Sequence, residues 1–207
     1  MIFVYARCSR RNYGSRRPEM NLYTVLGSFV AFLVFVPLTY RVWRKTLQQN
    51  VTTYALWGML DFVDAGSIFL KDGNYLLPAM YSLLSFGVVL GGIRAKTFSF
   101  GKLEAFISAL VLICMGVWYF VGDREATIIS SISVSIASIP LIVDSLRKPM
   151  QAPVLEYIGF TIANGLSIAG GADWSVAERF YPGVCTATTA IFVIVLLACR
   201  FRRTRLT

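Results

Sequence analysis

The chain contains two matching stretches: Pro37-Leu38-Thr39-Tyr40-Arg41-Val42-Trp43-Arg44-Lys45 and Pro140-Leu141-Ile142-Val143-Asp144-Ser145-Leu146-Arg147-Lys148. They are separated by 103 positions (140 − 37), and at this offset seven of the eighteen residues from 37 to 54 are identical. Chance would give about one identity, and an internal repeat decides the architecture before any local pattern does. The sequence therefore predicts a duplicated unit. In a membrane protein, such a repeat also indicates where a solute would bind.

The composition is that of an integral membrane protein. Of the 207 residues, 56% are hydrophobic and 15% are charged, whereas soluble domains average about 25% charged residues. An apolar stretch of about 17–25 residues can span a bilayer, and seven such spans are predicted. They are residues 22–40, 53–70, 77–93, 104–121, 127–143, 154–171 and 183–199.

The loops differ in basic charge, which predicts the orientation of the chain. The segments after the odd-numbered spans carry twelve Lys and Arg residues, and those after the even-numbered spans carry three. The C-terminus is therefore expected in the cytoplasm and the N-terminus outside. Residues 1–19 conflict with this orientation, because they carry five arginines. Either translation starts at Met20 and the extension is not native, or a basic tail is translocated.

The repeat and the orientation together predict the fold. The first and fifth spans match and four crossings separate them, so both copies have the same orientation. Pro78 and Pro182, which open the third and seventh spans, support the alignment with a one-residue gap. We expect an all-α integral membrane fold of seven transmembrane helices, with two parallel three-helix repeats joined by a linker helix (3+1+3). The expected parts are a basic N-terminal extension (1–19), a first repeat (20–99), a linker helix (100–125), a second repeat (126–199) and a basic cytoplasmic tail (200–207).

Each repeat carries aromatic and polar residues along one face of its second helix. The spacing i, i+3, i+7 and i+10 brings the four residues of each stripe onto one helical face. The stripes are Tyr54, Trp57, Asp61 and Asp64 in the first copy, and Tyr157, Phe160, Asn164 and Ser167 in the second. One stripe is acidic and the other neutral. Small hydroxyl residues, Ser82 and Thr186, lie at matching heights in the third and seventh spans, with Tyr81 and Cys185 beside them. These residues predict a solute-binding cavity between the repeats. For Ser82 and Thr186 the alternative role is close packing between helices.

Asp61 is expected near the middle of its span, where a carboxylate costs about 2.5–3.5 kcal/mol on insertion scales. A polar cavity would offset that cost, and burial favours the neutral acid, so Asp61 is a candidate for proton coupling. The alternative is an aspartate that is hydrogen-bonded to neighbouring helices or wetted from the outer surface. Asp144, four residues after Pro140, is a second proton-coupling candidate. Its alternative role is that of a solvated residue at the cytoplasmic end of the fifth span.

The repeated prolines are candidate hinges. A proline removes one helical hydrogen bond and can kink a helix. Pro37 and Pro140 both lie toward the cytoplasmic ends of their spans, where matched kinks would let two helix bundles move against each other. The alternative is that both prolines are tolerated near helix ends without any such role.

Several classes of function are disfavoured by the residues that are missing. The chain has no histidine, and its four cysteines form no C-x-x-C pair, so neither a metal site nor a disulfide framework is predicted. No cofactor is predicted either. A retinal protein needs a lysine in the last span, and residues 183–199 contain none. No P-loop or paired catalytic motif is present, so an enzyme is not expected. The net charge of +9 lies in the loops, which disfavours binding to nucleic acid.

The proline followed by basic residues, and then a second helix bearing Trp or Phe, resembles the PQ-loop superfamily, which includes the SWEET and semiSWEET sugar transporters. The stretch from Phe100 to Arg203 is similar to uncharacterised bacterial seven-helix PQ-loop-like membrane proteins, in Ile139-Pro140 through Arg147-Lys148-Pro149 and in Arg179-Phe180-Tyr181-Pro182. The glutamine typical of the family is Leu38 and Leu141 here. The asparagine pair of SWEET-like proteins is missing, so a sugar pocket is not carried over.

The resemblance implies a transporter of a small polar solute in the bacterial inner membrane, working by alternating access between two triple-helix bundles. Sugars, amino acids and similar metabolites are the expected solutes, with or without proton linkage, and the lipid bilayer is the other partner. A homo-oligomer is compatible with the sequence. The alternative is a non-transporting multi-pass membrane protein, such as a receptor, scaffold or assembly factor. Short loops disfavour a receptor, because they leave little surface outside the membrane.

Overall fold

A computed structural model describes residues 21–96, 100–120, 123–149 and 151–204 of the chain. The basic extension predicted for residues 1–19, with the alternative start at Met20, lies outside these residues, as does the end of the basic tail. The described residues form helices and turns and contain no β-strand. The prediction of an all-helical chain is therefore confirmed.

The helices correspond to the predicted spans. They are α1 (Leu22–Trp43), α2 (Val51–Phe69), α3 (Leu76–Ala95), α4 (Lys102–Phe120), α5 (Asp123–Ala137), α6 (Ile139–Arg147), α7 (Val154–Gly170), the π-helical turn η1 (Val176–Phe180) and α8 (Tyr181–Thr204). Only Ser138 separates α5 from α6, so these two helices together take the place of the fifth span. Among the residues that the structure describes, four stretches are long and apolar enough to cross a membrane: Leu22–Trp43, Leu76–Ala95, Arg124–Arg147 and Val176–Arg202. The chain is thus an integral membrane protein by the length and hydropathy of its helices.

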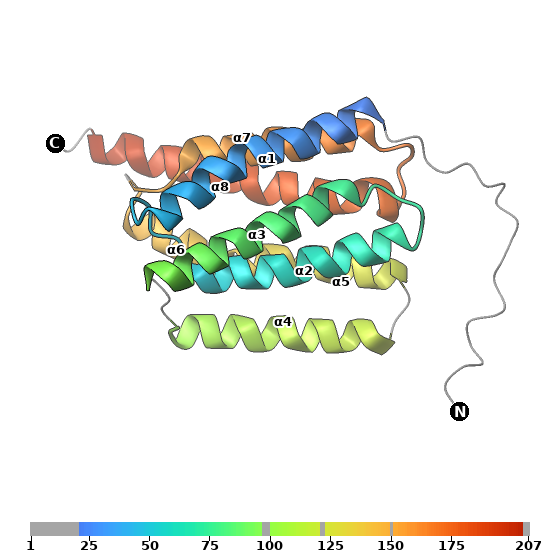
Figure 1. Ribbon diagram of the computed structural model, residues 1–207, viewed down its shortest axis with the longest axis horizontal. Coiled ribbons are helices and arrows are strands. Elements are labelled where there is room, and N and C mark those ends of the chain that lie inside the picture. The colour runs from blue at the N-terminus through green and yellow to red at the C-terminus, as the bar shows by residue number, and fades with distance from the viewer. Residues whose placement is uncertain (1–20, 97–99, 121–122, 150, 205–207) are drawn as a thin grey trace, which may run out of the picture.

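The helices lie side by side with alternating directions (Figure 1). Helices α1, α3, α5 with α6, and α8 run one way, and α2, α4 and α7 run the other way. Because α1, α3, α6 and α8 end on the same side, one end of the molecule contains the basic residues at or near their last residues, Arg44, Lys96, Arg147 and Arg200. We call it the basic end.

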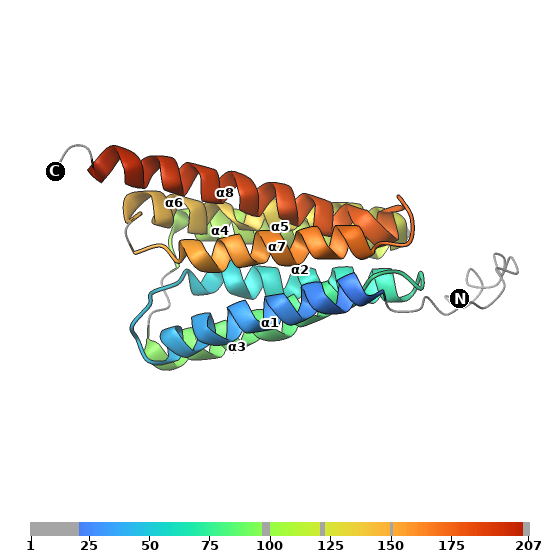
Figure 2. The same cartoon turned by 90° about the horizontal axis from the view of Figure 1, so that it is seen from above.

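Two groups of three helices pack against each other (Figure 2). In the first group α3 packs on both α1 and α2, and in the second α8 packs on both α7 and α5. The groups are joined where α1 packs on α7 and where α2 packs on α5. Helix α4 packs on α5 and α2 and lies at the edge of the molecule (Figure 1). The core thus lies mainly between the two groups, and α4 adds Ile107 and Val111 to it from the edge of the molecule.

Glycines allow the backbones of α1 and α7 to approach closely. A Cβ atom at Gly27 would lie 2.7 Å from the carbonyl oxygen of Ala163, and one at Gly170 would lie 2.7 Å from the backbone nitrogen of Thr24. Contacts this short exclude any side chain, because real Cβ atoms do not approach backbone atoms below 3.0 Å. The first group therefore joins the second through a glycine-dependent helix crossing.

The two repeated prolines occupy different positions in their helices. Pro37 lies inside α1, which continues unbroken to Trp43. Pro140 lies in the first turn of α6, directly after the interruption at Ser138. Proline has no N–H group and is well tolerated at the first turn of a helix, which explains why a new helix starts here. The hinge role of both prolines stays a prediction.

Candidate functional site

A cavity lies at the join between the two groups of helices. Its volume is about 50 Å³ when measured as the space open to the centres of water molecules, and one ordered water needs about 10–15 Å³ by that measure. The cavity therefore has room for a few water molecules. It is lined by Phe35, Trp57, Asp61, Tyr81, Ser85, Val134, Ser138, Phe160, Asn164, Tyr181, Cys185, Thr188 and Thr189. All the helices except α4 and α6 supply at least one of these residues.

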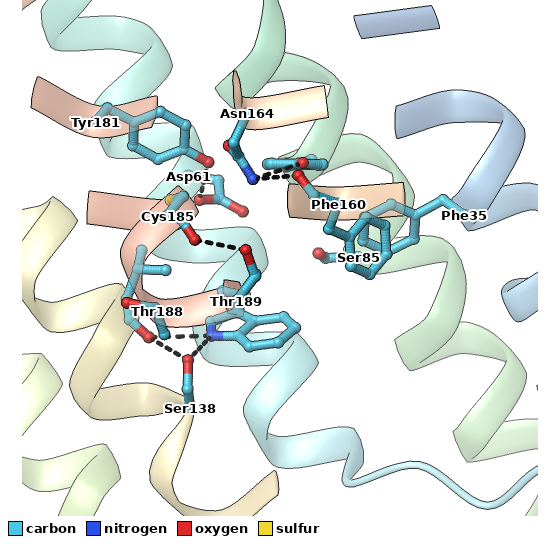
Figure 3. Close-up of a pocket in the computed structure, with 13 residues that line it drawn as sticks. Phe35, Asp61, Ser85, Ser138, Phe160, Asn164, Tyr181, Cys185, Thr188 and Thr189 are labelled. Carbon is cyan, nitrogen blue, oxygen red and sulfur yellow. Dashed lines mark hydrogen bonds between the residues drawn. The ribbon is translucent and has the colours of Figure 1, made fainter. Parts of the chain in front are cut away.

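The middle of each predicted stripe reaches the cavity. Trp57 and Asp61 come from α2, and Phe160 and Asn164 come from α7. Figure 3 shows the side chains of Asp61 and Asn164 directed toward the same space from opposite helices. The structure thus brings together the two polar positions that the repeat alignment pairs with each other.

Two tyrosines bond these polar side chains across the join. The hydroxyl of Tyr181, at the start of α8, donates to Oδ1 of Asp61 on α2 over 2.8 Å. Nδ2 of Asn164, on α7, donates to the hydroxyl of Tyr81 on α3 over 3.1 Å. Each bond runs from the third helix of one group to the second helix of the other group. Both bonds therefore hold the two groups together at the cavity.

Two polar atoms of the cavity lining keep unused hydrogen-bonding capacity. Within the part of the chain that the structure describes, neither Asn164 Oδ1 nor Ser85 Oγ has a hydrogen-bond partner, and both atoms are buried. A buried polar group without a partner costs about 1–3 kcal/mol, so such groups call for an explanation. A molecule bound in the cavity would satisfy both.

Aromatic rings form a large part of the cavity wall. Nε1 of Trp57 donates to the carbonyl of Val134 over 3.1 Å and to Ser138 Oγ over 3.2 Å, which fixes the indole against α5. Phe35 packs on Phe160 with ring centroids 4.8 Å apart and on Tyr81 at 5.7 Å. The rings therefore have fixed positions, and the cavity is preformed on its aromatic side.

Asp64 lies outside the cavity, in a pocket of hydroxyl groups between α2 and α5. Ser130 Oγ donates to Asp64 Oδ1 over 2.5 Å, and Ser131 Oγ lies 3.4 Å from the same oxygen. Ser67 and Thr127 share a hydrogen bond of 3.1 Å next to them. The aspartate therefore joins α2 to the serine-rich helix α5, and its predicted role in solute binding has no support from its position.

The other predicted binding residues also make contacts between or within helices. Tyr54 packs on Phe35 and Trp57, Tyr157 packs on Phe160 and Phe192, Ser82 donates to Gly58, Ser167 accepts from Asn74, and Thr186 donates to Pro182. None of these five residues is among those that line the cavity in the described parts of the chain. Their neighbours Tyr81 and Cys185, the alternative pair in the third and seventh spans, do line it.

Asp144 lies at the basic end and not in the cavity. Nδ2 of Asn50 donates to Asp144 Oδ2 over 2.9 Å and to Glu104 Oε1 over 3.1 Å, while Oδ1 of Asn50 caps the start of α2. Arg147 lies 4.0 Å from Asp144. Asp144 thus belongs to a polar cluster that connects the starts of α2 and α4 to α6. Its proton-coupling role stays a prediction.

The sequence did not predict the remaining cavity residues, namely Phe35, Val134, Ser138, Tyr181, Thr188 and Thr189, together with Ser85. One signal was present for Tyr181, because it directly precedes Pro182, the proline that aligns the repeats. For the others, the position depends on how each helix is rotated about its axis, and the repeat alignment does not set that rotation.

Comparisons with models of protein families, with curated proteins and with solved structures found no match for this chain.

Proposed function

We propose that this protein is a SWEET/PQ-loop-like membrane transporter that carries a small polar solute by alternating access between two triple-helix bundles. The bundles are α1–α3 and α5–α8, joined by α4 as a linker. Support comes from the equivalence of the contacts. Helix α3 packs on α1 and α2 as α8 packs on α5 and α7, and exchanging the bundles converts the α1–α7 contact into the α5–α2 contact. This is the pattern expected of a duplicated three-helix unit with pseudo-twofold symmetry.

The observation that carries the proposal is the position and chemistry of the cavity. It lies at the join of the two bundles, where repeat-built transporters bind their substrates. It contains the Asp61 carboxyl and two buried polar atoms, on Ser85 and Asn164, that lack hydrogen-bond partners among the described residues. Buried polar groups normally have hydrogen-bond partners, and a bound solute would supply partners for these two atoms.

The size of the cavity supports movement of the bundles. A solute larger than a few water molecules does not fit the present volume of about 50 Å³, so the bundles must separate when it enters or leaves. The hydrogen bonds Tyr181–Asp61 and Asn164–Tyr81 cross the join and would break and form again in each cycle. We place the basic end in the cytoplasm, because Lys and Arg favour that side, and the chain in a bacterial inner membrane.

A ligand screen tests this proposal. The full chain in detergent is heated with sugars, amino acids, small organic acids and nucleosides, and a bound solute raises the unfolding temperature. Trp57→Ala should weaken binding of any hit at least fivefold, because it removes a wall of the cavity. Trp174→Ala is the matched control, since Trp174 lies outside the cavity and is 84% exposed. A hit that is unaffected by Trp57→Ala binds elsewhere and contradicts the proposal.

Uptake into proteoliposomes tests proton linkage separately. Asp61 is the candidate, because its carboxyl lies in the cavity wall and bonds across the join to Tyr181. If a proton moves with the solute, an imposed pH gradient should drive accumulation above the equilibrium level. Accumulation that is the same with and without the gradient would rule out a proton role and leave a facilitated carrier.

A further inference from the structure

The predicted spans of the chain contain acidic side chains without basic ones. Asp61 and Asp64 lie within the second predicted span, and none of the seven predicted spans contains a Lys or Arg. Asp64 bonds to Ser130 on α5. Asp61 lies in the cavity wall, and its bond from Tyr181 is a neutral hydroxyl contact. Asp61 is therefore either neutral, with its own proton, or ionised and compensated by the positive charge of a bound solute.

The rest of the cavity wall is suited to a positive charge. Five of the thirteen described lining residues are aromatic: Phe35, Trp57, Tyr81, Phe160 and Tyr181. Neither Lys nor Arg occurs among the described lining residues. The faces of aromatic rings attract cations, most strongly where water is excluded, and aromatic cages recognise ammonium groups in this way. A carboxylate beside such rings adds a charge-assisted hydrogen bond.

The unsatisfied polar atoms fit the same kind of ligand. Asn164 Oδ1 can only accept a hydrogen bond. The amide nitrogen of the same side chain already donates to Tyr81 and Phe160. Ser85 Oγ can also accept. With the Asp61 carboxylate, the wall offers acceptors from three helices, and a primary ammonium group has three N–H donors. An anionic solute would lie next to the Asp61 carboxylate, and no basic side chain among the described lining residues would pair with it.

From this wall we propose that the transported solute is a small organic cation, carrying a primary ammonium group that binds between Asp61, Asn164 and the aromatic rings. This inference rests on the proposed transport function and narrows its substrate class. Sugars and carboxylic acids without an amine are then poor ligands. The ammonium group of the solute supplies the positive charge that the described side chains of the cavity lining lack.

The proposal is tested on the full chain in detergent by comparing the binding affinities of ligand pairs. The two members of a pair have similar shapes but different charges. Ethanolamine is compared with ethylene glycol, and 3-aminopropan-1-ol with propane-1,3-diol, at constant pH and ionic strength by calorimetry. We expect each cation to bind at least tenfold more tightly than its neutral partner. Asp61→Asn should abolish this preference. Asp64→Asn should keep it, because Asp64 lies on the same helix and is buried but does not line the cavity.

The outcomes separate this proposal from the proposed function. Equal binding of charged and neutral partners by the wild-type chain overturns the cation proposal, and this comparison needs no variant to fold. A cation preference that persists in Asp61→Asn overturns it as well. If a neutral or anionic solute from the screen binds and Trp57→Ala weakens it, the transport function stands and the cation proposal falls. If neither the pairs nor the screened solutes bind, both proposals fall.

Discussion

Replacing Gly27 by valine is expected to lower the free energy of unfolding by about 2–3 kcal/mol, the cost of overpacking a close contact. The Cβ atom would lie 2.7 Å from the carbonyl oxygen of Ala163 and 3.2 Å from the backbone nitrogen of Ser167. Backbone atoms of α7 cannot rotate away as a side chain can, so α1 and α7 have to separate. Because Phe35 on α1 and Asn164 on α7 both line the cavity, solute binding should weaken together with stability.

The matched control is Gly165→Val. Gly165 also lies in a helix, α7, but a Cβ atom there would meet no described atom within 4 Å. Both variants carry the same change in helix propensity, so the difference between their unfolding free energies reports the α1–α7 contact alone. Thermal or denaturant unfolding in detergent measures it. Equal unfolding midpoints for the two variants would show that α1 and α7 do not depend on this close approach.

Replacing Asn164 by leucine is expected to reduce affinity for the transported solute at least tenfold while changing stability by about 1 kcal/mol. Leucine is close to asparagine in size, and substituting a buried polar group by an apolar one of the same shape can be nearly neutral. The variant loses the donor to Tyr81, and it also loses the Oδ1 acceptor that has no partner in the described structure. Loss of binding without loss of folding would mark Asn164 as a ligand-contacting residue.

Asn74→Leu provides the comparison for this result. Asn74 is likewise a buried asparagine whose Nδ2 is bonded, here to Ser167, and whose Oδ1 finds no partner among the described groups. It lies in the connection between α2 and α3 and does not line the cavity. We expect this variant to lose about 1–2 kcal/mol of stability and to keep its affinity, as measured by titration calorimetry. If both leucine variants lose affinity to the same extent, the effect of Asn164→Leu is structural.

The overall fold was largely predictable because bilayer insertion imposes simple rules on the chain. Length and hydropathy located the helices, and backbone hydrogen bonding in lipid excludes open sheets. The interruption of the fifth span at Ser138 was less evident. Pro140 indicated a kink, but the identical proline in the first copy, Pro37, lies in an unbroken helix. Local sequence around a proline therefore does not decide alone whether a helix breaks.

The candidate site was predictable in part, for a geometric reason. A stripe from i to i+10 extends about 15 Å along a helix, which is longer than a cavity for a few water molecules. Only its middle positions, such as Asp61 and Asn164, line the cavity, while Asp64 and Ser167 pack against neighbouring segments. On α8, neighbouring residues point about 100° apart, so deciding between Thr186 and Cys185, which lines the cavity, required the rotation of that helix about its axis. Packing between helices sets this rotation, and it is not encoded in the spacing of one segment.

The interruption at Ser138 also gives the two sides of the molecule different bending stiffness. Helix α1 is continuous from Leu22 to Trp43, whereas the matching span of the second bundle is divided into α5 and α6. Helices bend most easily where the regular run of the helix is interrupted. Ser138 also holds the indole of Trp57, so bending at this point shifts one wall of the cavity directly. We therefore expect thermal bending to be concentrated in the second bundle, with the first bundle serving as the more rigid frame.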